Sequence, residues 1–214
     1  MSFDPLPSPR RAPDAERRER ILEAAERAFA AHGFHAATMQ HVAEAAGMSA
    51  GNLYRTFPSK EAIVEGLCWR DQQEQAADFA HLAGGKNIDI FAAVARGLKQ
   101  HVAYRPRRKL TLFVEIWAEA ARNPAIGAIT RAMDKDALTK IEQAVAIAKA
   151  CGEAAPAIDA QAVARLFFTY VGGLIKRLAL EPDLDREAEA DRAADLFKAL
   201  CKGALAAAAQ EAAQ

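Results

Sequence analysis

The sequence contains little cysteine. Its 214 residues include only Cys68, Cys151 and Cys201, which are odd in number and far apart. A disulfide framework is therefore excluded, and no spacing of cysteine and histidine matches a zinc site. The N-terminal segment carries proline and charge where a signal peptide needs an apolar stretch. We expect a protein of the reducing cytoplasm that holds no metal or other cofactor, with all three thiols buried and inert.

The sequence also lacks an excess of charge and a long hydrophobic run. Its 28 Lys+Arg balance 28 Asp+Glu, which excludes a generally basic nucleic-acid coat protein. The apolar run at residues 166–175 is half the roughly 20 residues needed to span a bilayer, so we expect no membrane partner. Aromatic residues make up only 7% of a chain that is 51% hydrophobic and rich in alanine. This composition favours helices.

From Asp14 onward the apolar residues follow a helical period, and no alternating strand pattern competes with it. We expect an all-α fold of about nine helices. Residues 1–13, rich in proline, are expected to be disordered, residues 14–60 to form a small head of three helices, and residues 61–214 to form a larger body. Within the body we expect helices at residues 60–82, 87–104, 107–121, 125–151, 158–180 and 187–208.

The head contains a helix-turn-helix pattern. Thr38 can cap a short helix that Gly47 ends, and Ser49 can cap a following helix that Pro58 stops. In this arrangement the second helix enters the DNA major groove with its N-terminal residues. Asparagine pairs with adenine and arginine with guanine, while small residues allow close approach to the groove. The candidate DNA-binding residues are Thr38, Gln40, Ser49, Ala50, Gly51, Asn52, Tyr54, Arg55 and Lys60, with Thr38, Tyr54 and Lys60 suited to phosphates.

Residues 38–61, from Thr38 through the Ala46-Gly47-Met48-Ser49 turn to Ser59-Lys60-Glu61, resemble the DNA-binding head of the TetR family of bacterial transcription regulators. The segments Ile21–Ala25 and Phe29–Phe34 also resemble that family's first helix. Two positions depart from its pattern: His41 stands where an acidic residue is common, and Thr56 where an aromatic residue or histidine is common. The likeness covers about 50 residues in one register.

The resemblance implies a helical body that binds a small molecule and dimerises. The expected function is a homodimeric repressor that a small, mainly apolar inducer releases from a near-palindromic DNA operator. Candidate ligand-binding residues are Phe113, Trp117, Phe167 and Tyr170. The apolar faces of helices 158–180 and 187–208 are expected to form the dimer interface.

Other interpretations stay open at this point. The basic residues around Pro106 either form a solvated turn or approach DNA; they are Arg105, Arg107, Arg108 and Lys109. A helical adaptor that binds proteins is an alternative function. A helical-bundle enzyme is a weaker alternative, because no Glu-x-x-His pair or nucleotide-binding glycine loop occurs, and we expect no enzymatic activity.

Overall fold

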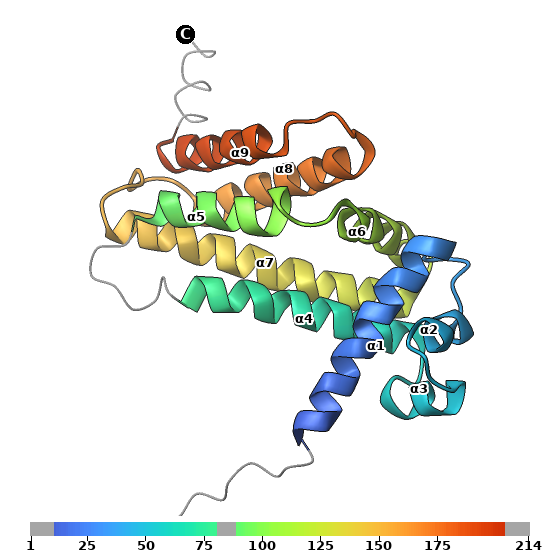
Figure 1. Ribbon diagram of the computed structural model, residues 1–214. Coiled ribbons are helices and arrows are strands. Elements are labelled where there is room, and N and C mark those ends of the chain that lie inside the picture. The colour runs from blue at the N-terminus through green and yellow to red at the C-terminus, as the bar shows by residue number, and fades with distance from the viewer. Residues whose placement is uncertain (1–10, 81–88, 204–214) are drawn as a thin grey trace, which may run out of the picture. The chain divides into compact units, whose positions relative to one another are not determined.

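The computed structural model describes residues 11–80 and 89–203 (Figure 1). Every regular element in these two ranges is helical, so the prediction of an all-α fold is confirmed. None of the helices in the described ranges combines the length and hydrophobicity needed to cross a bilayer. The chain divides into two compact units, the first ending at Trp69 and the second beginning at Arg70.

The first unit contains three helices and the start of a fourth. These are α1 (Arg11–His32), α2 (Met39–Ala45), α3 (Ala50–Thr56) and the first part of α4 (Lys60–Ala80). Their buried side chains form one small core, which includes Ile21, Leu22, Phe29, Phe34, Val42, Leu53, Phe57, Ile63, Val64 and Leu67. Because the opening turns of α4 contribute to this core, the unit extends nine residues past the boundary at residue 60 expected from the sequence.

Helix α1 begins before the predicted start at Asp14 and includes residues 11–13 of the segment expected to be disordered. Pro13 is compatible with this, because the N–H that proline lacks falls in the first turn, where backbone donors have no partner within the helix. Residues 1–10 of that segment lie outside the described residues.

The second unit contains the rest of α4 and five further α-helices. They are α5 (Ile90–Leu98), α6 (Arg107–Ala120), α7 (Pro124–Ala150), α8 (Ala160–Leu180) and α9 (Arg186–Cys201). Helix α8 packs against α6, α7 and α9, and α5 packs against α9 and α7. Their shared core includes Ile90, Leu110, Val145, Phe167, Leu178 and Phe197.

The helix expected at residues 87–104 differs from a regular α-helix at its C-terminal end. Residues Lys99–Ala103 form a π-helical turn, here η1, closed by the bond from the Tyr104 N–H to the Lys99 carbonyl at 2.8 Å. The wider turn precedes Pro106, which cannot continue the hydrogen-bond ladder. The guanidinium of Arg186 donates to the carbonyls of Val102 and Arg105. The side chain of Arg186 therefore satisfies acceptors that the end of the helix leaves open.

A buried ion pair lies beside this turn. The Arg105 guanidinium contacts the Asp71 carboxylate at 2.7 Å, and the two side chains are only 6% and 8% exposed. Arg105 also lies over the ring of Phe113, with 5.1 Å from its guanidinium carbon to the ring centroid. The pair ties the second part of α4 to the turn before α6.

The expectation that all three thiols are buried is wrong for Cys151. Cys68 and Cys201 are buried, but Cys151 is exposed because it follows the last turn of α7. Burial raises the pKa of Cys201 to about 11, against a smaller opposing effect of Lys202. A thiol with so high a pKa is almost entirely protonated at neutral pH and reacts slowly.

We expect a thiol reagent such as DTNB to modify one cysteine quickly in the folded protein at pH 7.5, and three after denaturation. Mass spectrometry should place the fast modification at Cys151. The variant Cys151→Ser should lose it, while Cys201→Ser should keep it. Fast modification of Cys201 in the folded protein would contradict the burial described above.

Candidate nucleic-acid interface

The second helix of the head begins with a reciprocal pair of hydrogen bonds. The Thr38 hydroxyl accepts from the His41 N–H at 3.2 Å, and His41 Nδ1 accepts from the Thr38 N–H at 3.3 Å. This is a capping box in which the imidazole nitrogen replaces the carboxylate or amide that usually accepts. The His41 ring also stacks on His32, with 4.0 Å between centroids. His41 therefore fixes the start of α2 and its contact with α1.

The turn between α2 and α3 is set by a glycine and a serine. Gly47 has φ of +64°, a left-handed conformation that glycine adopts without strain. The Met48 N–H then donates to the Ala43 carbonyl at 3.0 Å, which closes the end of α2. Ser49 Oγ accepts from the Asn52 N–H at 3.3 Å and caps α3. The residues named as caps from the sequence thus occupy those positions.

Helix α3 buries few of its side chains completely. Leu53 is its only buried residue. Ser49, Gly51, Tyr54 and Arg55 are exposed, and Ala50 and Asn52 are half-buried. A Cβ added at Gly51 would meet nothing within 4 Å, so packing within the chain does not require glycine there. The predicted groove-facing residues are brought together on one short helix, with space around Gly51.

Lys60 is placed differently from the other candidates. Its ammonium donates to the carbonyls of Phe34, His35 and Ala37 at 2.9, 3.2 and 3.2 Å, and lies 4.6 Å from the centroid of the Phe34 ring. An ammonium has three N–H donors, and these contacts use all of them. This geometry favours a role for Lys60 in holding the turn between α1 and α2 over the direct phosphate contact that the sequence suggested.

Two other candidates lie at the exposed surface of α2 and its cap. Thr38 and Gln40 are both exposed. The Gln40 amide donates to the Glu44 carboxylate at 2.8 Å, one turn along the same helix. The Thr38 hydroxyl accepts from within the chain, and its own proton is available to donate to a phosphate.

Sequence reasoning missed three arginines of α1 that contact the helix-turn-helix. Arg17 donates to the Asn52 carbonyl at 2.9 Å, and Arg27 donates to the Ala45 carbonyl at 3.1 Å. The guanidinium carbon of Arg18 lies 4.3 Å from the centroid of the Phe57 ring. The residues next to Arg17, Arg18 and Arg27 in the sequence do not indicate these contacts, because the partners lie on other helices or at their ends.

The basic cluster around Pro106 is not a uniform solvated turn. Arg105 is buried in the ion pair with Asp71, so it presents no charge to DNA. Arg107 donates to the Glu181 carbonyl at 2.9 Å, and Arg108 is exposed. Arg105 is therefore buried by its ion pair with Asp71, which lies 34 residues away in the sequence.

The four aromatic residues predicted to bind a ligand fall into two groups. Phe113 and Trp117 stack along α6 with 6.3 Å between ring centroids, and Trp117 is 37% exposed. Phe167 packs on Phe197 of α9 at 5.0 Å, within the core, and Tyr170 lies partly buried against that core. Two polar surface hollows of about 430 and 870 Å³ occur along α9, and none of the four lines either of them.

Comparison with known proteins agrees with the geometry of the head. Residues 21–67 match the family model described as bacterial regulatory proteins, tetR family, and residues 101–206 match the BetI-type transcriptional repressor C-terminal model. The regulator UidR of Escherichia coli K12 is 32% identical over 171 residues, which cover 80% of this chain and 85% of UidR. The chain belongs to the TetR family.

A further regulator and a solved structure are similar over comparable lengths. TtgR of Pseudomonas putida is 30% identical over 177 residues, covering 78% of this chain and 82% of TtgR. The solved structure of Salmonella enterica GusR covers 92% of this chain and 99% of its own, with a TM-score of 0.73 and 26% identity. The protein is thus a helix-turn-helix transcriptional regulator of the DNA-binding TetR type rather than an enzyme.

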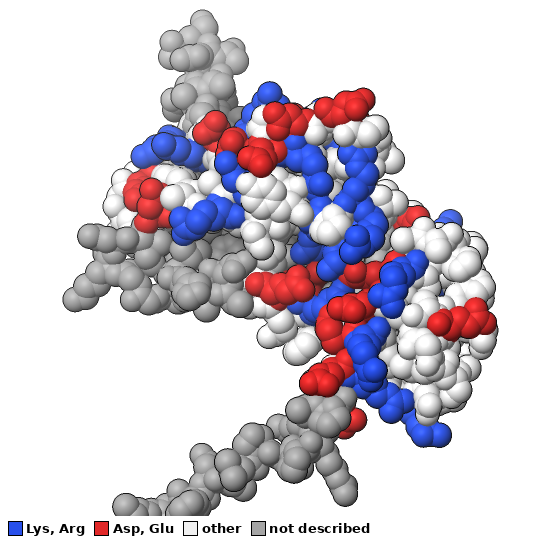
Figure 2. All heavy atoms as spheres, viewed as in Figure 1, with Lys and Arg blue, Asp and Glu red and all other residues white. Residues whose placement is uncertain are grey.

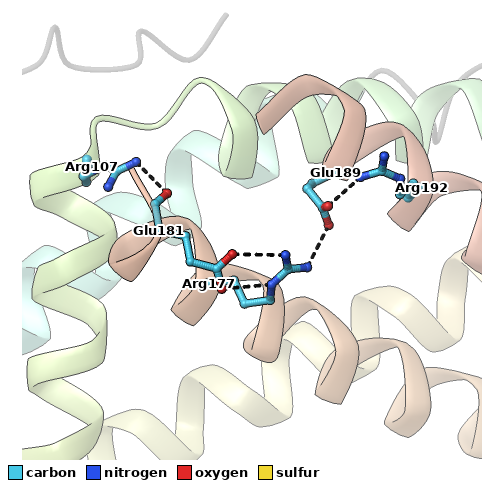
Figure 3. Close-up of polar contacts among 5 residues, drawn as sticks. All are labelled: Arg107, Arg177, Glu181, Glu189 and Arg192. Atoms are coloured by element: carbon cyan, nitrogen blue, oxygen red, sulfur yellow. Dashed lines mark hydrogen bonds and ion pairs between the residues drawn. The ribbon is translucent and has the colours of Figure 1, made fainter. Parts of the chain in front are cut away.

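In this TetR-family body, a polar network joins the end of α8 to α9 (Figure 3). Arg177 contacts Glu181 at 3.1 Å and Glu189 at 3.3 Å, and Arg192 contacts Glu189 at 2.6 Å. Glu189 is only 5% exposed, so the two guanidinium groups compensate a buried carboxylate. The hydrogen bonds to Glu181 are the largest cause of the raised pKa of Arg177. The network fixes α8 and α9 as one hairpin.

Part of the apolar face of α9 that the sequence offered for dimerisation is used within the single chain. Ala193, Phe197 and Leu200 lie in the core of the second unit. On α8, by contrast, Leu166 and Leu180 are 51% and 63% exposed. Of the residues expected in helix 187–208, those from 204 onward lie outside the described residues.

Proposed function

We propose that the protein is a homodimeric repressor of the bacterial cytoplasm, released from a near-palindromic operator by a small, mainly apolar inducer. The observation that carries the proposal is the capped α2–turn–α3 unit, whose second helix leaves Tyr54 and Arg55 exposed and Asn52 half-buried. Two such heads related by a twofold axis fit successive major grooves, about 34–36 Å apart.

Base contacts are assigned to Asn52 and Arg55. Ala50 and Gly51 are assigned the role of small residues that allow the backbone of α3 to approach the groove closely. Phosphate contacts are assigned to Thr38, Gln40, Ser49 and Tyr54. Lys60 contributes mainly by holding the turn that positions these residues. The net charge of the chain is zero, and Figure 2 shows acidic and basic side chains intermixed on the face in view. Operator affinity therefore depends on the geometry of the two heads more than on a field of one sign.

The dimer is assigned to the outer face of α8 together with α9. The exposed residues Leu166, Thr169, Gly173 and Leu180 follow helical spacing along α8. A Cβ added at Gly172 or Gly173 would meet nothing within 4 Å in the single chain, so a second copy can approach this backbone closely. Two α8–α9 hairpins then form a four-helix interface.

The inducer is assigned to the body, near Phe113 and Trp117 of α6, with Tyr170 and Phe167 on α8. Helix α4 passes from the first unit into the second without a break. A ligand that binds one arrangement of the body better than another changes the position of α4, and with it the spacing of the two heads.

The test is DNase footprinting of the purified protein on the DNA upstream of its own gene. We expect a protected site with twofold symmetry. Asn52→Ala and Arg55→Ala should each weaken binding to that site by about 5- to 150-fold, because each loses a base contact of about 1–3 kcal/mol. Titration of each variant on the protected duplex gives the change.

A matched control for Arg55→Ala is Arg96→Ala, which removes an equal charge from an exposed position on α5. It should leave operator affinity within about twofold. Absence of any protected site at low salt would contradict the proposed function, and equal losses for Arg55→Ala and Arg96→Ala would contradict the assigned base contact.

A further inference from the structure

Helix α3, which is proposed to enter the major groove, buries little of its own surface within the chain. It is seven residues long and buries only Leu53. Its main helical neighbour is α2, itself seven residues long. Helices of this length are not stable in isolation. The orientation of α3 must therefore be fixed by contacts from elsewhere in the head.

Arg17 of α1 supplies one such contact. Its guanidinium donates to the backbone carbonyl of Asn52 at 2.9 Å, across 35 positions of sequence. Asn52 is the residue assigned to read a base, so this bond holds the main chain at the point where the reading side chain leaves it. A hydrogen bond from a charged donor is shorter and stronger than a neutral one.

Arg18, the next residue, acts at the other end of α3. Its guanidinium lies over the ring of Phe57, the C-cap residue of the helix. A Cβ added at Gly66 of α4 would lie 2.8 Å from Phe57 Cε1 and 3.2 Å from an Arg18 nitrogen. The absence of a side chain at Gly66 leaves the space that the stacked pair occupies.

We propose that Arg17 and Arg18 are positioning residues for operator recognition. Arg17 acts on the main chain of α3 and Arg18 on its C-cap residue. The guanidinium of Arg17 donates to a protein carbonyl rather than to a phosphate. The inference rests on the proposed operator binding. On this proposal, Arg17 and Arg18 contribute to discrimination between DNA sequences and little to the overall attraction to DNA.

The consequence for Arg17 is specific. If it positions α3, its loss misplaces Asn52 and lowers affinity for the operator while affinity for unrelated DNA changes little. If it binds a phosphate instead, its loss weakens both equally and lowers the slope of log K against log salt concentration by about 0.9. The two roles are distinguished by the ratio of operator to non-specific affinity.

The experiment compares Arg17→Met with Arg20→Met. Both remove one positive charge from the same part of α1, but Arg20 is exposed and Arg17 is half-buried against α3. Binding of each variant is titrated on the footprinted duplex and on a shuffled duplex of equal length, at several salt concentrations. Because one preparation binds both duplexes, the ratio of the two affinities is independent of the fraction of protein that is folded.

We expect Arg17→Met to lower this ratio about 10-fold, the effect of losing a hydrogen bond to a charged donor. Its salt slope should equal that of Arg20→Met, whose ratio should stay within twofold of the unmodified protein. An unchanged ratio for Arg17→Met, or a slope lowered only in that variant, would overturn the inference. If the unmodified protein protects no DNA, it is the proposed function that fails.

Discussion

Replacing Asp71 by alanine is expected to lower the free energy of unfolding of the second unit by about 3–5 kcal/mol. The substitution leaves the Arg105 guanidinium, only 6% exposed, without its carboxylate partner at 2.7 Å. An uncompensated buried charge is among the costliest defects in a folded protein. For a unit of this size the melting temperature should fall by roughly 10 °C or more. Calorimetry of the purified variant measures both quantities.

The matched control is Asp136→Ala, which breaks an ion pair with Lys140 in which the aspartate is 41% exposed. It should cost at most about 0.5 kcal/mol. The double variant Asp71→Leu with Arg105→Met should recover most of the loss, since neither charge is then buried. A cost for Asp71→Ala no greater than that for Asp136→Ala would show that the pair is hydrated in solution.

Replacing Phe57 by alanine should destabilise the head by about 3–5 kcal/mol, as expected for a large aromatic side chain removed from a core. Phe57 is 1% exposed and supports both Arg18 and the end of α3. We therefore expect operator binding to be lost together with the stability of the head. Hydrogen exchange by mass spectrometry, on peptides from residues 20–60, reports the opening of this unit directly.

Tyr54→Ala provides the control, because it removes an aromatic ring from the same helix at a position that is 50% exposed. Its effect on the stability of the head should stay within about 0.5 kcal/mol. Its operator affinity should still fall, through loss of the proposed phosphate contact. Fast exchange in the head of Tyr54→Ala would contradict this division of roles.

The parts of the fold that the sequence predicted well are those determined by local chemistry. Thr38, Gly47 and Ser49 act on neighbouring backbone groups, so their caps and turn are readable from four or five consecutive residues. Helix α8 was expected at residues 158–180 and is found at Ala160–Leu180 for the same reason, with Asp159 as its N-cap.

The parts that the sequence did not predict depend on distant partners. The Lys60 ammonium lies on carbonyls 23 to 26 residues earlier, and Arg105 is buried by Asp71, 34 residues away. A basic residue has the same local signature whether it meets a phosphate, a carbonyl or a buried carboxylate. The aromatic candidates are a similar case, because Phe167 has a core partner, Phe197, on another helix.

The single buried side chain of α3 also bears on how this protein changes over evolution. Leu53 is the one fully buried residue of this helix, so we expect substitutions at the exposed positions Gly51, Tyr54 and Arg55 to have little effect on folding. On the proposed function, gene duplicates would acquire new operators through substitutions at these positions, while the proposed contacts from α1 keep the helix in place. On the same proposal, α3 is the segment to exchange in order to transfer the DNA specificity of one regulator to another.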